Sequence, residues 1–142
     1  LLEGCTGITD ILCLSNLKSL ERLELDGCTG VTDFSCLANL ESLQYLILAC
    51  CSGLTDISYL ANLEFLELLN LEDCTQLTDI SYLTSIESLK KLYLQGCSGL
   101  TDFACLTNIE SLKDLGIRDC TGLNNSDIQK LISELPYCHI NY

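Results

Sequence analysis

Residues 20–42 read LERLELDGCTGVTDFSCLANLES, and this pattern returns every 23 residues along the chain. Four columns of identical residues carry the repeat: Cys5, Cys28, Cys51, Cys74, Cys97 and Cys120; Asp10, Asp33, Asp56, Asp79 and Asp102, each after a threonine; Leu14, Leu37, Leu60, Leu83 and Leu106; and Leu20, Leu43, Leu66, Leu89, Leu112 and Leu135. A period this strict indicates a repeat architecture, in which each unit packs mainly against its neighbours.

The spacing of apolar residues within one unit predicts its local structure. Leu23 and Leu25 are two residues apart, the period of a strand with both side chains inward. Leu37 and Leu40 are three apart, which suits a helical turn, and Asp33 can cap that turn by accepting from backbone N–H groups. We therefore expect each unit to be a strand, a turn and a short helical return, with the strands forming one parallel sheet.

The whole chain, 1–142, is predicted to be a single domain of about six 23-residue units. Counting by 23 to the end predicts seven strands, centred near Leu2, Leu25, Leu48, Leu71, Leu94, Ile117 and Ile140. The last return differs from the others, because Asn124 and Asn125 replace Thr-Asp. Residues 126–135 read SDIQKLISEL, which predicts an α-helix capped by Ser126 or Asn125 and ended by Pro136. We interpret 124–142 as a C-terminal cap, with this helix and the last strand.

Charge and hydropathy narrow the kinds of partner. The formal net charge is −13, which argues against binding to nucleic acid or to an anionic membrane. No apolar run approaches the roughly 18 residues of a membrane span. The chain starts inside a repeat and without Met, so we expect either further upstream sequence or association through the uncapped first layer at Leu1 and Leu2.

The cysteines invite a metal-site or disulfide hypothesis, but their spacing favours packing. Zinc needs ligands that converge, often as C-x-x-C pairs, whereas the main column places one cysteine in each layer. We expect these to be buried free thiols in a reducing, cytoplasmic compartment. A second column, Cys13, Cys36 and Cys105, contains tyrosines in other units and is predicted to be half-buried. Cys50 is predicted to point outward and is the best candidate for a reactive thiol, although we favour a passive surface cysteine.

The sequence contains few residues that could support catalysis or bind an ion. The aspartate column could suggest calcium, but capping explains it better. His139 is the single histidine, and no nucleophile–base pair or phosphate-binding glycine loop is implied. We therefore expect no enzyme activity, no cofactor and no metal.

The outward strand positions change from unit to unit, as a recognition surface would. The column of Glu24 is predicted to end in His139, and that of Arg22 in Tyr137. An apolar centre is predicted at Tyr45, Ile47, Ala49, Leu68 and Tyr93, flanked by Glu24, Asp26, Glu72 and Asp73 on one side and by Lys91 and Arg118 on the other. Such an arrangement is typical of protein interfaces, although sheets favour aromatic and branched residues anyway. The predicted partner-binding residues are Tyr45, Ile47, Leu68, Asn70, Lys91, Tyr93 and Arg118.

The pattern LxxLxLxxC, followed by an apolar residue and Thr-Asp, resembles the leucine-rich repeat family. The TDIS stretches at 55–58 and 78–81 are similar to internalin-type short repeats, and the cysteine column is similar to the repeats of F-box proteins. The resemblance implies an α/β fold, a right-handed βα solenoid with the parallel sheet on its concave face and short helical or 3-10 returns on its convex face. The repeated motif is highly specific for this fold and hardly specific for a function, so partner binding rests on the outward strand residues.

Two alternatives to a simple binding module stay open. The chain could be the targeting module of a larger enzyme, such as a ubiquitin ligase component or a bacterial effector that works in the host cytosol. It could also be a purely structural array.

Overall fold

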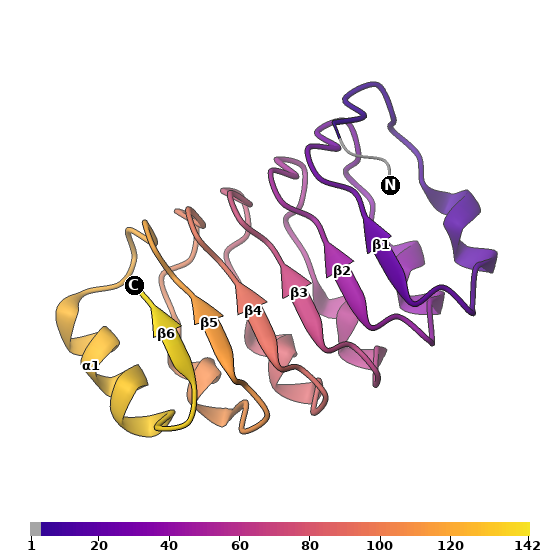
Figure 1. Cartoon of the computed structure of the whole chain (residues 1–142). Helices are drawn as coiled ribbons and strands as arrows, with labels where there is room; N and C mark the ends of the chain where they lie inside the picture. The colour runs from indigo at the N-terminus through magenta and orange to yellow at the C-terminus, as the bar shows by residue number, and fades with distance from the viewer. Residues whose placement is uncertain (1–3) are drawn as a thin grey trace.

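The computed structural model describes residues 4–142 and shows one parallel sheet with a short return behind each strand (Figure 1). The strands lie side by side in sequence order: β1 (Arg22–Glu24), β2 (Tyr45–Ile47), β3 (Leu68–Asn70), β4 (Lys91–Tyr93), β5 (Asp114–Gly116) and β6 (His139–Asn141). Five returns are 3-10 helices: η1 (Leu12–Asn16), η2 (Ser35–Asn39), η3 (Ser58–Asn62), η4 (Ser81–Ser85) and η5 (Ala104–Asn108). The sixth return, which follows β5, is the α-helix α1 (Asn125–Glu134). The predicted α/β leucine-rich repeat solenoid is thereby confirmed.

The strands are short and begin earlier in each unit than the sequence predicts. In β1 to β5 the middle residue is the first inward leucine, such as Leu23, so the predicted centre at Leu25 and its counterparts is two residues too late. Pairing nevertheless continues past the strand, since the Leu25 N–H donates to the Ile47 carbonyl at 2.9 Å and the Gly27 N–H to the Ala49 carbonyl at 2.7 Å. The predicted strand near Leu2 lies outside the described residues.

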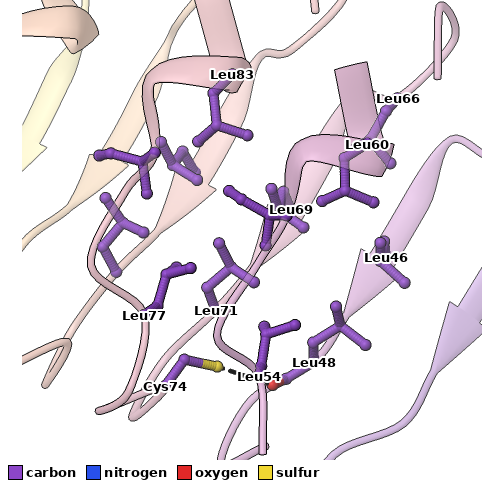
Figure 2. Packing of buried hydrophobic residues seen from close by; sticks show 14 of the residues in the cluster. Leu46, Leu48, Leu54, Leu60, Leu66, Leu69, Leu71, Cys74, Leu77 and Leu83 are labelled. Atoms are coloured by element: carbon purple, nitrogen blue, oxygen red, sulfur yellow. Dashed lines mark hydrogen bonds between the residues drawn. The ribbon is translucent and has the colours of Figure 1, made fainter. Parts of the chain in front are cut away.

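The core is a stack of leucine layers between the sheet and the returns. Leu46, Leu69 and Leu92 from the strands, together with Leu60 and Leu83 from the returns, are fully buried. Figure 2 shows Leu46, Leu60, Leu69 and Leu83 in the space between the sheet and the returns. One unit alone could not cover them, so each unit depends on its neighbours for its stability.

The aspartate column ties the loop to the return, as predicted. The Asp33 side chain accepts from the Ser35 N–H at 2.9 Å, and the same bond recurs at Asp10, Asp56, Asp79 and Asp102. The Ser35 hydroxyl and N–H hold the pKa of the Asp33 carboxyl below its ordinary value. Each carboxylate thus satisfies a backbone donor at the start of a 3-10 helix, which is a structural role.

The last unit departs from the 23-residue register, and the prediction that it keeps the period is wrong. From β1 to β5, partners are 23 residues apart, as in Leu92 with Leu115, but Leu115 pairs with Ile140, 25 residues on. The unit with the α-helix is therefore two residues longer than the units with 3-10 returns. Its cap is Asn124, not Ser126 or Asn125: the Asn124 side chain accepts from two N–H groups, and Asp127 completes a capping box.

A left-handed backbone turn follows each strand up to β5. The residues in this column have φ between 56° and 72° and are Gly4, Gly27, Cys50, Asp73, Gly96 and Asp119. Glycine adopts this conformation without strain and aspartate tolerates it better than most residues do. Cys50 is therefore the least suited residue in the column.

Among residues 4–142, no helix is long and apolar enough to cross a membrane.

Candidate protein-binding surface on the concave sheet

The strand register places the predicted interface residues side by side. Tyr45 pairs with Leu68, and Leu68 with Lys91, along one column of the concave face. Asn70 lies between Ile47 and Tyr93 in the next column. The structure therefore brings six of the seven predicted residues onto three adjacent strands, β2, β3 and β4. Arg118 follows β5 on the same side and is exposed. Their role in binding stays a prediction.

The apolar side chains of this surface are half-buried. Tyr45, Ile47, Ala49, Leu68 and Tyr93 each keep part of their area in solvent, whereas the inward neighbours Leu46 and Leu69 have none. These five residues, with Asn70, Lys91 and Arg118, are called the concave patch below. A partner that covers the patch would remove apolar area from water without disturbing the core.

Arg22, on β1, lies next to Tyr45 at one edge of the patch. Its guanidinium lies 5.8 Å from the centre of the Tyr45 ring and forms an ion pair with Glu24 at 2.5 Å. Strand alternation in the sequence identifies Arg22 as an outward residue, but it gives no reason to expect contact with Tyr45. The register supplies that link, since Arg22 and Tyr45 are partners in adjacent strands.

Two polar side chains of the patch have fixed orientations. The Tyr93 hydroxyl donates to Asp114 at 2.9 Å, so the ring is held across β4 and β5. Burial, reinforced by the Asp114 carboxylate, raises the pKa of Tyr93. Asn70 accepts from the Glu72 N–H at 2.8 Å and donates to the Glu72 carboxylate at 3.2 Å. Its side chain is thus already occupied with the turn, and it offers a partner less than the sequence suggests.

Lys91 and Arg118 are the exposed cations of the patch. Among residues 4–142, the structure shows no ion pair for either of them, whereas Lys18, Arg22 and Lys90 pair with glutamates. Unpaired cations on a chain with net charge −13 are well suited to orienting an acidic group of a partner.

The two-residue shift in the last unit corrects two placements. His139 pairs with Asp114 and so lies in the column of Arg22, not in that of Glu24. Its ring nitrogen is 3.3 Å from the Asp114 carboxylate. Tyr137 precedes β6 and is 86% exposed, so it belongs to neither strand column.

The main cysteine column is buried and hydrogen-bonded. Cys28, Cys51, Cys74, Cys97 and Cys120 are buried and Cys5 is half-buried. The Cys74 thiol donates to the Leu48 carbonyl of the preceding unit at 3.2 Å (Figure 2), and the same bond recurs at Cys51, Cys97 and Cys120. Burial raises the pKa of Cys51 and Cys120 to about 11 and that of Cys97 to about 12. These thiols join neighbouring units and are poor nucleophiles.

The remaining cysteines are less uniform than predicted. In the second column Cys36 is buried, Cys105 is half-buried and Cys13 is exposed, so the half-buried prediction holds only in part. Cys50 is exposed as predicted, but its pKa is raised, first by burial and then by Asp73 and Asp26. A raised pKa reduces the thiolate fraction, so the structure favours the passive interpretation of Cys50. Among residues 4–142, no group of three or more His, Cys, Asp or Glu is placed to hold a metal ion.

Comparisons with known proteins agree with this geometry. A sequence model described as the BspA-type leucine-rich repeat region matches residues 1–124 in six copies. Structural comparison finds internalin F of Listeria monocytogenes, with 30% identity and a TM-score of 0.75 over 94% of this chain and 37% of that one. Internalin C2 of the same organism has 28% identity and a TM-score of 0.75, over 94% of this chain and 55% of that one.

A leucine-rich repeat protein of Leptospira interrogans shares the fold, with 20% identity and a TM-score of 0.76 over 95% of this chain and 34% of that one. The chain spans roughly a third to a half of the length of these three structures. No curated protein sequence matches it.

The fold and the repeat define a leucine-rich repeat solenoid, a class that commonly serves as a protein-interaction module. Within that class, the chain belongs to the BspA-type leucine-rich repeat family.

Proposed function

We propose that this chain binds a partner protein through the concave patch. The observation that carries the proposal is the half-buried apolar group of Tyr45, Ile47 and Leu68 on adjacent strands, next to the unpaired cation Lys91. Aromatic and aliphatic anchors with a charged rim are the usual anatomy of a protein interface. The repeat fold requires none of these side chains, because its core is complete behind the sheet.

Protein is a better partner than nucleic acid or a membrane surface. Glu24 lies beside the patch on β1, and Glu72 and Asp73 follow β3, so acidic side chains border the patch where a phosphate backbone or an anionic lipid surface would have to lie. The patch also has too few cations for either ligand, since Lys91 and Arg118 are the only two among its residues.

A comparative capture tests the proposal. Immobilised parent protein and the variant Tyr45→Ala/Leu68→Ala are exposed to the same native lysate, and the recovered proteins are compared by mass spectrometry. We expect at least one protein to be enriched by the parent and lost with the variant. Tyr82→Ala is the matched control, because Tyr82 is 42% exposed in η4, on the side of the returns. If every protein recovered by the parent is recovered equally by the double variant, the proposal is wrong.

We also propose that the chain works in a reducing, cytoplasmic compartment. The support is the column of buried thiols that donate to carbonyls, a role that an oxidised sulfur could not fill. Thiol titration of protein prepared without reductant or oxidant is expected to give few reactive groups before unfolding and eleven after it. Finding several disulfides would contradict the proposal.

A further inference from the structure

One loop of the array breaks the repeat in a way that the fold does not require. The residue before the Leu20-type leucine is serine in four units, phenylalanine in one and glutamate in the last, whose return is α-helical; the column is Ser19, Ser42, Phe65, Ser88, Ser111 and Glu134. Phe65 lies in the loop between η3 and β3 and is 60% exposed. These loops lie at the edge of the sheet where the strands begin (Figure 1).

Two serines of this column, Ser88 and Ser111, have a structural task that phenylalanine cannot perform. The Ser88 hydroxyl donates to the Leu66 carbonyl at 2.8 Å, and the Ser111 hydroxyl to the Leu89 carbonyl at 2.7 Å, in each case joining a unit to the one before it. Phe65 has no hydroxyl to donate. The substitution therefore gives up a bond between units and exposes an aromatic ring, and neither change helps the fold.

The surroundings of Phe65 are hollowed and acidic. A hollow between consecutive units is lined by Ala61, Asn62, Glu64, Phe65, Ser85 and Glu87. The same hollow one unit further on is lined by Thr84, Glu87, Asn108 and Glu110 among others, and it has no aromatic residue. Among residues 4–142, neither Glu64 nor Glu87 forms an ion pair. The hollow between units is a repeated feature of the array. At Phe65 this hollow has an apolar side chain beside the unpaired carboxylates of Glu64 and Glu87.

We propose that the Phe65 hollow is a second docking site, separate from the concave patch, for an extended protein segment that presents an apolar side chain flanked by lysine or arginine. The apolar side chain would cover the Phe65 ring, and the flanking cations would face Glu64 and Glu87. A lone exposed aromatic residue is ordinary on protein surfaces. Here it coincides with a hollow, with complementary charge and with the loss of a bond that the next two units make.

The test titrates 15N-labelled protein with a synthetic Lys-Leu-Lys-Leu-Lys peptide and follows the amide shifts. We expect shifts concentrated at 61–67 and 84–88, and weaker binding as salt is raised. Phe65→Ser, which restores the residue of the column and so should fold, is expected to lower the affinity at least about tenfold. Glu64→Gln with Glu87→Gln is expected to lower both the affinity and its salt dependence. The concave variant Tyr45→Ala/Leu68→Ala is expected to bind the peptide as the parent does.

Four results would overturn the proposal. The first is Phe65→Ser binding the peptide within about twofold of the parent. The second is a Glu-Leu-Glu-Leu-Glu peptide binding as well as the lysine peptide. The third is shifts that fall on the concave strands and disappear in the concave variant. The fourth is a parent protein that self-associates in light scattering while Phe65→Ser stays monomeric, because the occupant would then be a second copy of the chain.

Discussion

The two faces of the same strands behave differently. The inward position at the middle of β1 to β5 is leucine in every case: Leu23, Leu46, Leu69, Leu92 and Leu115. The outward position beside it holds six different residues across the six strands: Arg22, Tyr45, Leu68, Lys91, Asp114 and His139. The interior must fill a constant volume in every layer, so it repeats. The outward side chains of the concave face do not have to fill that volume, so they can differ from strand to strand, as a binding surface requires.

The largest expected effect compares the two sides of one strand. Leu69→Ala removes a fully buried side chain and should lower the free energy of unfolding by about 2–5 kcal/mol. Leu68→Ala, one residue away on the half-buried face, should cost clearly less, about 1 kcal/mol or below. Urea denaturation followed by circular dichroism measures both. Equal losses would mean that the concave side chains belong to the fold and not to a recognition surface.

The buried thiols predict a loss of stability at alkaline pH. Burial raises the pKa of Cys51 and Cys120 from 9.0 to about 11, and that of Cys97 to about 12. Above pH 9 the unfolded chain loses these protons while the folded chain keeps them. The stabilisation is therefore complete below pH 9 and is lost as the pH rises through 11 to 12, with a slope of up to about 1.4 kcal/mol per pH unit for each thiol.

Urea denaturation at a series of pH values between 8 and 10.5 checks this expectation. Cys97→Ala removes one of the thiols and should make the decline shallower. A parent protein whose stability is constant over that interval would show that these thiols are not buried as described.

The left-handed column predicts a cost for any side chain with a Cβ. Gly27 has φ of +66°, and an added Cβ would have its nearest heavy atom, the Gly4 Cα, at 3.5 Å, so strain and not collision sets the effect. Gly27→Ala should destabilise the protein by about 1–2 kcal/mol. Gly7→Ala is the control, because Gly7 is outside the left-handed region and its added Cβ would meet nothing within 4 Å. Thermal denaturation distinguishes the two variants, and a harmless Gly27→Ala would refute the strain argument.

The same column predicts a small gain at Cys50. Its φ is 57°, so Cys50→Gly should relieve strain and raise stability by about 0.5–1 kcal/mol. Cys50→Ala keeps the strain and should leave stability nearly unchanged. If Cys50→Gly destabilises the protein, the thiol makes a contribution that its exposed position does not suggest.

The repeat made most of the fold predictable, and the variant unit shows where prediction stops. Leucine spacing identifies the strands, the returns and the buried cysteine column because every unit applies the same packing constraint. The capping residue Asn124 and the shift of β6 by two residues depend on the length of a single helix, which no other unit repeats. The column rule consequently misplaces His139 and Tyr137.

The candidate site was predictable as a set of positions but not as a set of contacts. Alternation along each strand identifies Tyr45, Leu68 and Tyr93 as outward. It cannot show that Arg22 lies over Tyr45 or that Tyr93 is tied to Asp114, because these contacts join neighbouring units and depend on rotamers. The sequence does mark Phe65, because it is an aromatic residue in a column that is otherwise mostly serine. That column lies in the loops before the strands, so alternation along the strands does not identify it.

Direct measurement of affinity for a captured partner tests the central claim. Isothermal titration calorimetry would compare the parent, Tyr45→Ala/Leu68→Ala and the control Tyr82→Ala, each first shown to have unchanged circular dichroism. Removal of two half-buried anchors should raise Kd at least about tenfold, while Tyr82→Ala should leave it within about twofold. An unchanged Kd for the double variant, or a larger loss with Tyr82→Ala, would contradict recognition through the concave face.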